Sequence, residues 1–285
     1  MRTKNYSSIK IKRLIFTILK YITLIIGVLI VIIPILVLIF AAFKTSSRYA
    51  TSSKLSLPNS FLYLYNFKQA LLHGNILTAS KNTAIILIFS LAGNILFGAM
   101  VAFVLNRFQF FGKKIILGLY LGAMLIPMVT NQVTTFKLIN SLGLFDTLAA
   151  PIVLYLGADV VGIYIMLLFM DSIPVSIDES AMLDGASYPY IFFRMILPNL
   201  KPAIVTVAII KGVAIYNDFY IPFLYLPTQA HQTLATALFN FIGPFSGKWP
   251  IICADVILMI LPTLIIFLLL QKYIYNGFTS GSVKG

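Results

Sequence analysis

Long apolar runs alternate with short polar segments along most of the chain. Each run is longer than the roughly 20 residues that a helix needs to cross about 30 Å of hydrocarbon. The runs lack the alternation of a barrel strand, and backbone groups in lipid must find hydrogen-bond partners within the segment. The runs are 21–43, 83–105, 115–136, 148–169, 202–225 and 251–275. The pattern therefore predicts an all-α integral membrane protein with six transmembrane helices.

Composition agrees with this class. Hydrophobic residues make up 60% of the chain and charged residues 10%, whereas soluble domains carry about 25% charged residues. The formal net charge of +13 would also suit a nucleic-acid-binding protein. The basic residues lie mostly in loops beside apolar runs, however, as they do in cytoplasmic loops of membrane proteins. We therefore expect contact with membrane lipid and no nucleic acid as a partner.

The basic residues also predict an orientation. Six of them precede the first apolar run: Arg2, Lys4, Lys10, Lys12, Arg13 and Lys20. Six spans put both termini on one side, and a cytoplasmic N-terminus places the larger share of Lys and Arg in the cytoplasm. The expected parts are a cytoplasmic N-terminal segment (1–20), a six-helix domain (21–275) with a cytoplasmic loop (170–201) between spans four and five, and a cytoplasmic tail (276–285).

That loop contains an unusually polar stretch, DESAMLDGASYPYIFFRMILP, at residues 178–198. Ser176 and Glu179 have the spacing of a capping box, which predicts a short helix from Ile177 to Asp184. Gly185 follows it, where helices often end on a residue with positive φ.

A second short helix is predicted after this glycine. Ser187 is placed to cap it, and we expect it to end before Pro198. The apolar side chains of Ile177, Ala181 and Met182 would suit docking into a groove on another protein. The residues alone fit equally well with an amphipathic loop that lies on the lipid surface.

The pattern E-S-A-x₃-G-x₉-M-x-L-P at residues 179–198 closely resembles the "EAA" motif, E-A-A-x₃-G-x₉-I-x-L-P, of permease subunits in binding-protein-dependent ABC importers. Ser180 replaces an alanine and Met195 replaces an isoleucine, and both changes are mild. The resemblance implies that this loop is a coupling helix seated in a cleft on an ATPase. The implied coupling residues are Glu179, Ser180, Ala181, Asp184, Gly185, Leu197 and Pro198.

Three further segments resemble the maltose-type, carbohydrate-importing branch of that family. YNDFYIPFLYL (216–226) is similar to its WNDFxxPL signature, and VAFVLNRFQFFGKK (101–114) to its YAFARxxFxGK loop. The ending QKYIYNGFTSGSVKG (271–285) is similar to its QRYFVxGLTAGAVKG tail. These matches point to the six-span partner subunit that carries such a tail.

The resemblance implies a half-transporter in a bacterial plasma membrane. Its implied partners are a second, different permease, two cytoplasmic ATPase subunits that bind ATP and Mg, and an extracellular solute-binding protein. The substrate would be a sugar, such as a disaccharide or oligosaccharide. The chain itself has no G-x-x-x-x-G-K-[ST] phosphate loop and no catalytic or metal-binding constellation. We therefore expect a transport subunit with no cofactor of its own and no enzymatic activity.

Charged residues inside predicted spans are costly and usually face a bundle interior or a water-filled path. They are Asp159, Lys211, Asp218 and Asp255. A sugar path is one interpretation for the polar and aromatic group Tyr216, Asn217, Asp218 and Tyr220, and pairing between helices is the other. For Asp159 and Lys211 we expect a structural ion pair.

Two other classes of protein remain open at this point. The first is a secondary transporter that is driven by an ion gradient, with Asp159 and Lys211 as its coupling charges. The second is a membrane scaffold that transports nothing.

Overall fold

The computed structural model describes residues 3–123, 125–126, 128–157, 159–241 and 247–280. Within these ranges every regular element is a helix, which confirms the all-α class. The chain divides into two compact units. The first consists of Met1–Gly74 with Asn240–Leu261, and the second of Asn75–Phe239 with Pro262–Gly285.

The first unit begins with the long helix α1 (Thr3–Ala42). Its stretch Leu14–Ala42 is long and apolar enough to cross a membrane, and the side chains at 14–36 are all exposed. The unit also contains α2 (Ser46–Thr51), α3 (Tyr65–His73) and the first part of α15 (Trp249–Ser280). Helix α1 therefore presents an apolar surface that lipid or another subunit must cover.

The loop after α1 is held by a buried lysine. The Nζ of Lys44 donates to the carbonyl of Ser53 at 2.9 Å and to the hydroxyl of Ser56 at 3.0 Å. Asn66, at the start of α3, donates to the carbonyls of Ala42 and Lys44, both at 2.8 Å. These bonds satisfy carbonyls at the end of α1 and fix the loop beside it.

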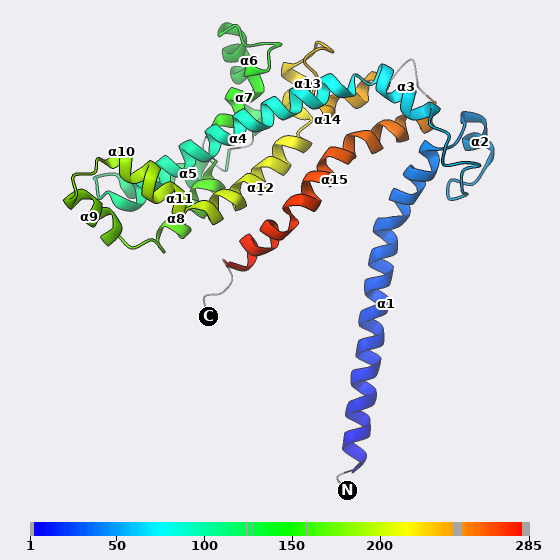
Figure 1. Cartoon of the computed structure of the whole chain (residues 1–285), viewed down its shortest axis with the longest axis horizontal. Helices are drawn as coiled ribbons and strands as arrows, with labels where there is room; N and C mark the ends of the chain where they lie inside the picture. Colours follow the sequence, from blue (N-terminus) through cyan, green and yellow to red (C-terminus); the bar gives the residue numbers. More distant parts are fainter. Residues whose placement is uncertain (1–2, 124, 127, 158, 242–246, 281–285) are drawn as a thin grey trace. The chain divides into compact units, whose positions relative to one another are not determined.

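The second unit is built around α4 (Ile76–Arg107). In Figure 1, α9, α10 and α11 lie near the C-terminal end of α4, and α13 and α14 lie toward its other end. The further elements are α5 (Lys113–Ala123), η1 (Met128–Asn131), α6 (Gln132–Ser141), α7 (Ala149–Leu156), α8 (Val160–Met170), α9 (Ser176–Leu183), α10 (Tyr188–Tyr190), η2 (Ile191–Ile196), α11 (Leu197–Asn199), α12 (Lys201–Asn217), α13 (Tyr220–Tyr225), α14 (Leu234–Ala237) and η3 (Leu238–Phe241).

Small residues on α4 let its neighbours approach closely, as is typical of helices packed in a membrane. Ala99 and Ala102 are fully buried in one core cluster with Met166 and Met170 of α8. Gly162 of α8 lies so close to α12 that an added Cβ would be 3.3 Å from a methyl group of Val207. This cluster also contains Ala181, Ile191, Phe192 and Ile196, so the segment after α8 packs directly on the transmembrane helices.

The number of spans stays a prediction. Among the described residues, Leu14–Ala42 and Ile76–Arg107 are each long and apolar enough to cross a membrane. Two bent helix pairs bring the total to at most four: Ala149–Leu156 with Val160–Met170, bent by 46°, and Tyr188–Asn199 with Lys201–Asn217, bent by 73°. Helix α15 continues to Ser280, beyond the expected end of the sixth run at residue 275.

The prediction of a single continuous helix over the third run, 115–136, is wrong. Helix α5 ends at Ala123, and the next regular element begins at Met128. A proline within a helix loses one hydrogen bond and clashes with the carbonyl four residues before it. Ala123 is the residue four before Pro127, which itself lies outside the described residues.

Candidate coupling segment and translocation path

The polar segment begins with helix α9, Ser176–Leu183, close to where it was predicted. The predicted capping box is wrong, because the helix starts directly after Val175 and no side chain caps it. The backbone N–H groups of Asp178 and Glu179 instead donate to the Val175 carbonyl, at 2.9 and 3.1 Å. The preceding turn thus supplies the acceptor that was expected from the Ser176 side chain.

The C-terminal end of α9 agrees with the prediction. Gly185 has φ +83°. Its N–H donates to the carbonyl of Met182 at 3.0 Å, and the N–H of Ala186 donates to the carbonyl of Ala181 at 2.9 Å. This pair of bonds is a Schellman motif. The glycine therefore ends α9 sharply and turns the chain back.

The second short helix runs further than expected. Ser187 stands at the N-cap of α10, but its side chain makes no capping bond. The helix continues through the π-helical turn η2 and through α11 to Asn199, so the predicted end before Pro198 is wrong. In the π-turn the N–H of Leu197 donates to Phe192, five residues back. Pro198 then lies in the first turn of α11, where its missing N–H costs little.

The implied coupling residues divide by exposure. Ala181 is only 3% exposed and packs inside the protein's own core, so it belongs to the support of α9 and not to an outer docking face. The outward apolar side chain is Leu183, which is 89% exposed, with Met182 beside it at 40%. Leu197 is half-buried. The remaining coupling residues are exposed: Glu179, Ser180, Asp184, Gly185 and Pro198.

An ion pair that the sequence did not predict anchors this segment. The Nε of Arg107, the last residue of α4, lies 2.6 Å from the Oδ2 of Asp178, and both side chains are 6% exposed. Arg107 also donates to the carbonyl of Ile173 at 3.0 Å. The two charges are 71 positions apart in the sequence, and no spacing rule links them. The polar character of each residue was visible, but their contact depends on the tertiary fold.

The fourth apolar run breaks into two helices at Asp159. This residue is the N-cap of α8 and accepts from the N–H of Val161 at 2.9 Å. Its other oxygen, Oδ2, lies 3.5 Å from the Nζ of Lys211 on α12. The expected pairing of Asp159 and Lys211 is therefore present. The break itself is supported by α4, because the side-chain amide of Asn94 donates to the carbonyls of Tyr155 and Gly157, at 3.3 and 2.5 Å.

The fifth run breaks in the same manner at Asp218. Its Oδ1 accepts from the N–H groups of Tyr220 and Ile221, at 2.8 and 3.2 Å, where α13 begins. Its Oδ2 accepts from the hydroxyl of Tyr155 on α7 at 2.7 Å. The carboxylate thus joins the breaks of two spans. Discontinuous transmembrane helices of this kind often frame substrate sites in transporters.

The four residues of the candidate sugar path have different surroundings. Asn217 and Tyr220 are exposed, whereas Tyr216 and Asp218 are partly buried. Asn217 donates to the carbonyl of Val213 at 2.9 Å, which leaves its own side-chain oxygen as an acceptor. The geometry favours Asn217 and Tyr220 for contact with a polar ligand, and it gives Asp218 a structural role in addition.

Asp255 on α15 is fully buried, and neither of its carboxylate oxygens has a hydrogen-bond partner among the described residues. The described residues as a whole contain no cluster of three or more His, Cys, Asp or Glu residues that could hold a metal ion.

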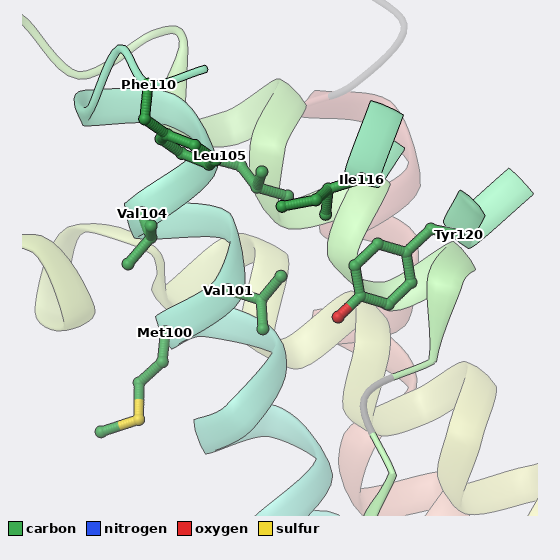
Figure 2. Close-up of a pocket in the computed structure, with 7 residues that line it drawn as sticks. All are labelled: Met100, Val101, Val104, Leu105, Phe110, Ile116 and Tyr120. Carbon is green, nitrogen blue, oxygen red and sulfur yellow. The ribbon is translucent and has the colours of Figure 1, made fainter. Parts of the chain in front are cut away.

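A pocket of about 330 Å³ opens between α4 and α5 (Figure 2). It is lined by Met100, Val101, Val104, Leu105, Phe110, Ile116 and Tyr120. Tyr120 contributes the single polar side-chain group among these seven residues. This pocket therefore offers a sugar few side-chain hydrogen-bond partners.

Asp146 ties the segment after α13 to the end of the α6–α7 connection. It accepts from the N–H of Thr228 and lies beside the Nδ1 of His231, both at 3.2 Å, and its other oxygen accepts from the Thr228 hydroxyl. Partial burial acts to raise the pKa of Asp146, but the bonds from Thr228 and His231 outweigh it and lower that pKa. The carboxylate is therefore ionised at neutral pH, and both of its oxygens accept hydrogen bonds.

The sequence matches the model of a known family. Residues 94–280 match the binding-protein-dependent transport system inner membrane component family, and the chain belongs to it. It is an integral membrane permease, as the resemblance of residues 179–198 indicated.

Relatives cover nearly the whole chain. The galactooligosaccharides transport system permease protein of Bacillus subtilis (strain 168) is 31% identical over 284 residues, which span 98% of this chain and 99% of that protein. The melibiose/raffinose/stachyose import permease protein of the same organism is 32% identical over 255 residues, or 89% and 91%. The fold is shared with a chain of a bacterial ABC transporter that imports the acidic polysaccharide alginate, with a TM-score of 0.81 at 20% identity over 91% of this chain and 96% of that chain.

Proposed function

We propose that this chain is one of two permease subunits in an ATP-driven importer for a disaccharide or oligosaccharide. Relatives of nearly equal length are named for the transport of galactooligosaccharides and of melibiose, raffinose and stachyose. A third, from Thermoanaerobacterium thermosulfurigenes, is named for starch degradation products and is 32% identical over 254 residues. These names support a sugar with more than one ring as the substrate.

One observation carries the proposal: α9 is buried against the protein on one side and exposed on the other. Behind it, Ala181 and Asp178 are buried against the transmembrane helices. In front, Glu179, Leu183 and Asp184 are exposed. An apolar side chain flanked by two carboxylates suits a groove on a separate protein, and in this proposal the groove belongs to an ATPase subunit that binds ATP and Mg.

The proposed partners are those that membership of the family implies. Two permeases, of which this chain is one, form the path, two ATPase subunits dock on their coupling loops, and an extracellular solute-binding protein delivers the sugar. Residues 170–201 and both termini lie in the cytoplasm. Asn217 and Tyr220, at the break of the fifth run, contact the sugar on its way through.

The geometry does not favour the ion-gradient alternative. Asp159 caps α8 and pairs with Lys211, so these two charges are engaged in holding a broken span. A pair that stabilises a helix end has a structural use that needs no transported ion.

The test is purification of the complete complex from the source membrane, followed by ATPase assays in liposomes. Sugars of one to five rings are offered one at a time with the binding protein. We expect hydrolysis and uptake to respond to a subset of sugars with two or more rings. A permease that purifies without any ATPase, and takes up sugar only with an ion gradient, would contradict the proposal.

A further inference from the structure

Helix α4 makes polar contacts, two of them hydrogen-bonded and one an ion pair, at three levels of the second unit. Near its N-terminal end, Asn82 donates to the carbonyls of Ala230 and Gln232, at 2.9 and 3.0 Å. In its middle, Asn94 donates to the two carbonyls at the break of the fourth run. At its C-terminal end, Arg107 pairs with Asp178 on α9. One continuous helix of 32 residues therefore contacts the α13–α14 connection, a broken span and the coupling segment.

The contact at the C-terminal end is the strongest of the three in physical terms. Two opposite charges lie 2.6 Å apart with side chains only 6% exposed, where water screens them little. The neighbouring Asn106 donates to Asp171 at 2.6 Å, just after the end of α8. Removal of one member of a buried ion pair leaves the other charge without compensation.

We propose that Arg107 and Asp178 clamp the coupling helix α9 to α4, so that the two helices move as one body when the ATPase pulls on α9. In this arrangement the displacement of α9 reaches the broken fourth span through Asn94 on the same rigid helix. Arg107 and Asp178 are positioning residues, because their buried side chains contact each other and neither the ATPase nor the sugar. The inference rests on the proposed function, since it requires that an ATPase act on α9.

The first experiment compares charge variants in the reconstituted importer with equal amounts of permease. Arg107→Asp and Asp178→Arg each place two like charges at a buried contact. We expect the exposed face of α9 still to bind the ATPase, while the amount of sugar taken up per ATP hydrolysed falls severalfold, because α9 can then move without α4. The exchange of both charges in one chain should restore much of that ratio.

A matched control is Lys114→Glu. It reverses one basic charge a few positions after Arg107, on an exposed side chain, and leaves the ion pair intact. We expect its uptake per ATP to equal that of the unaltered protein. Single variants with a normal ratio would overturn the clamp. An unaltered importer that shows no sugar-dependent hydrolysis would instead contradict the proposed function, whatever the variants do.

A second experiment does not depend on the folding of charge variants. Asn106→Cys and Asp171→Cys, in a chain with Cys253→Ser, place two thiols where a 2.6 Å hydrogen bond now joins α4 to the end of α8. A short reagent with two thiosulfonate groups then bridges them: each thiolate forms a disulfide with the reagent and releases a sulfinate, and a reductant later cleaves both disulfides. Asp171 ends α8 and begins the short connection to α9. If α4 moves together with this connection, uptake is the same before bridging, after bridging and after reduction. Uptake that is lost on bridging and recovered on reduction would overturn the proposal.

Discussion

Gly185 holds a backbone conformation that residues with a side chain rarely adopt. Its φ is +83°, and a Cβ added there would meet no atom within 4 Å. The restriction therefore comes from the backbone itself and not from crowding. For an L-residue a left-handed conformation costs about 1–2 kcal/mol, and β-branched residues are the least tolerant.

Replacement of this glycine tests the role of the turn. Gly185→Val should tilt α9 and weaken ATPase co-purification and sugar uptake severalfold, while the permease still inserts. Gly185→Asn is the matched variant, because asparagine tolerates positive φ better than valine does. We expect it to keep most of the uptake. Equal behaviour of the two variants in membranes with equal amounts of permease would argue against a conformational role.

The sequence predicted Gly185 correctly because a helix end requires a particular backbone conformation that local residues determine. The Ser176 cap failed for a related reason: the Val175 carbonyl competes for the same N–H groups and is equally local. The ion pair of Arg107 and Asp178 had no local signal at all, since it depends on how α4 and α9 pack.

At the scale of elements, the structure differs most from the predicted helices at the two broken spans. Hydropathy predicted continuous helices over 148–169 and 202–225, yet each divides at an aspartate whose carboxylate accepts from backbone N–H groups at the start of the next helix. A carboxylate within an apolar run has two uses, pairing with a cation or capping a helix. The choice between them needs the neighbouring helix, which a linear pattern does not reveal.

The break at Asp218 leads to a prediction that separates two adjacent residues. Asp218→Ala removes the acceptor for Tyr155 and for two N–H groups of α13. Hydrogen bonds to charged groups contribute about 1.5–3 kcal/mol each, so the amount of stable permease should fall. Asn217→Ala should leave that amount unchanged and reduce uptake, since its side chain is exposed at the same break.

The measurements are the melting temperature of the detergent-solubilised permease and the initial rate of sugar uptake. Asp218→Asn serves as a milder comparison, because its side-chain oxygen can still accept a hydrogen bond. Unchanged uptake in Asn217→Ala would remove this residue from the sugar path. A normal melting temperature in Asp218→Ala would remove the structural role of the carboxylate.

At the scale of the whole molecule, the distribution of Lys and Arg predicts which loops face the cytoplasm. A topology reporter fused after Ser187 should therefore read as cytoplasmic, and one placed within 50–60 as external. Both insertion points lie outside the helices that are long enough to span a membrane. A reporter after Ser187 that reads as external would contradict the six-span arrangement with a cytoplasmic N-terminus.

The C-terminal tail is a second segment for which the resemblance implies contact with the ATPase subunits. Helix α15 continues through Ser280, so part of the sequence NGFTSGSVKG extends the last helix. Residues 281–285 lie outside the described part of the chain, and the prediction that the tail contacts the ATPase subunits rests on the resemblance. Deletion of 277–285 should therefore alter the stimulation of ATP hydrolysis by sugar more than it alters membrane insertion.

A matched variant separates the length of the tail from its chemistry. Replacement of 277–285 by a Gly-Ser sequence of equal length keeps the reach and removes the specific side chains, including Lys284. If the side chains make the contact, this variant behaves like the deletion in ATPase assays of the reconstituted complex. If the deletion alone changes stimulation, length is what matters. Normal stimulation in both variants would mean that the tail takes no part in coupling, and that α9 communicates with the ATPase without it.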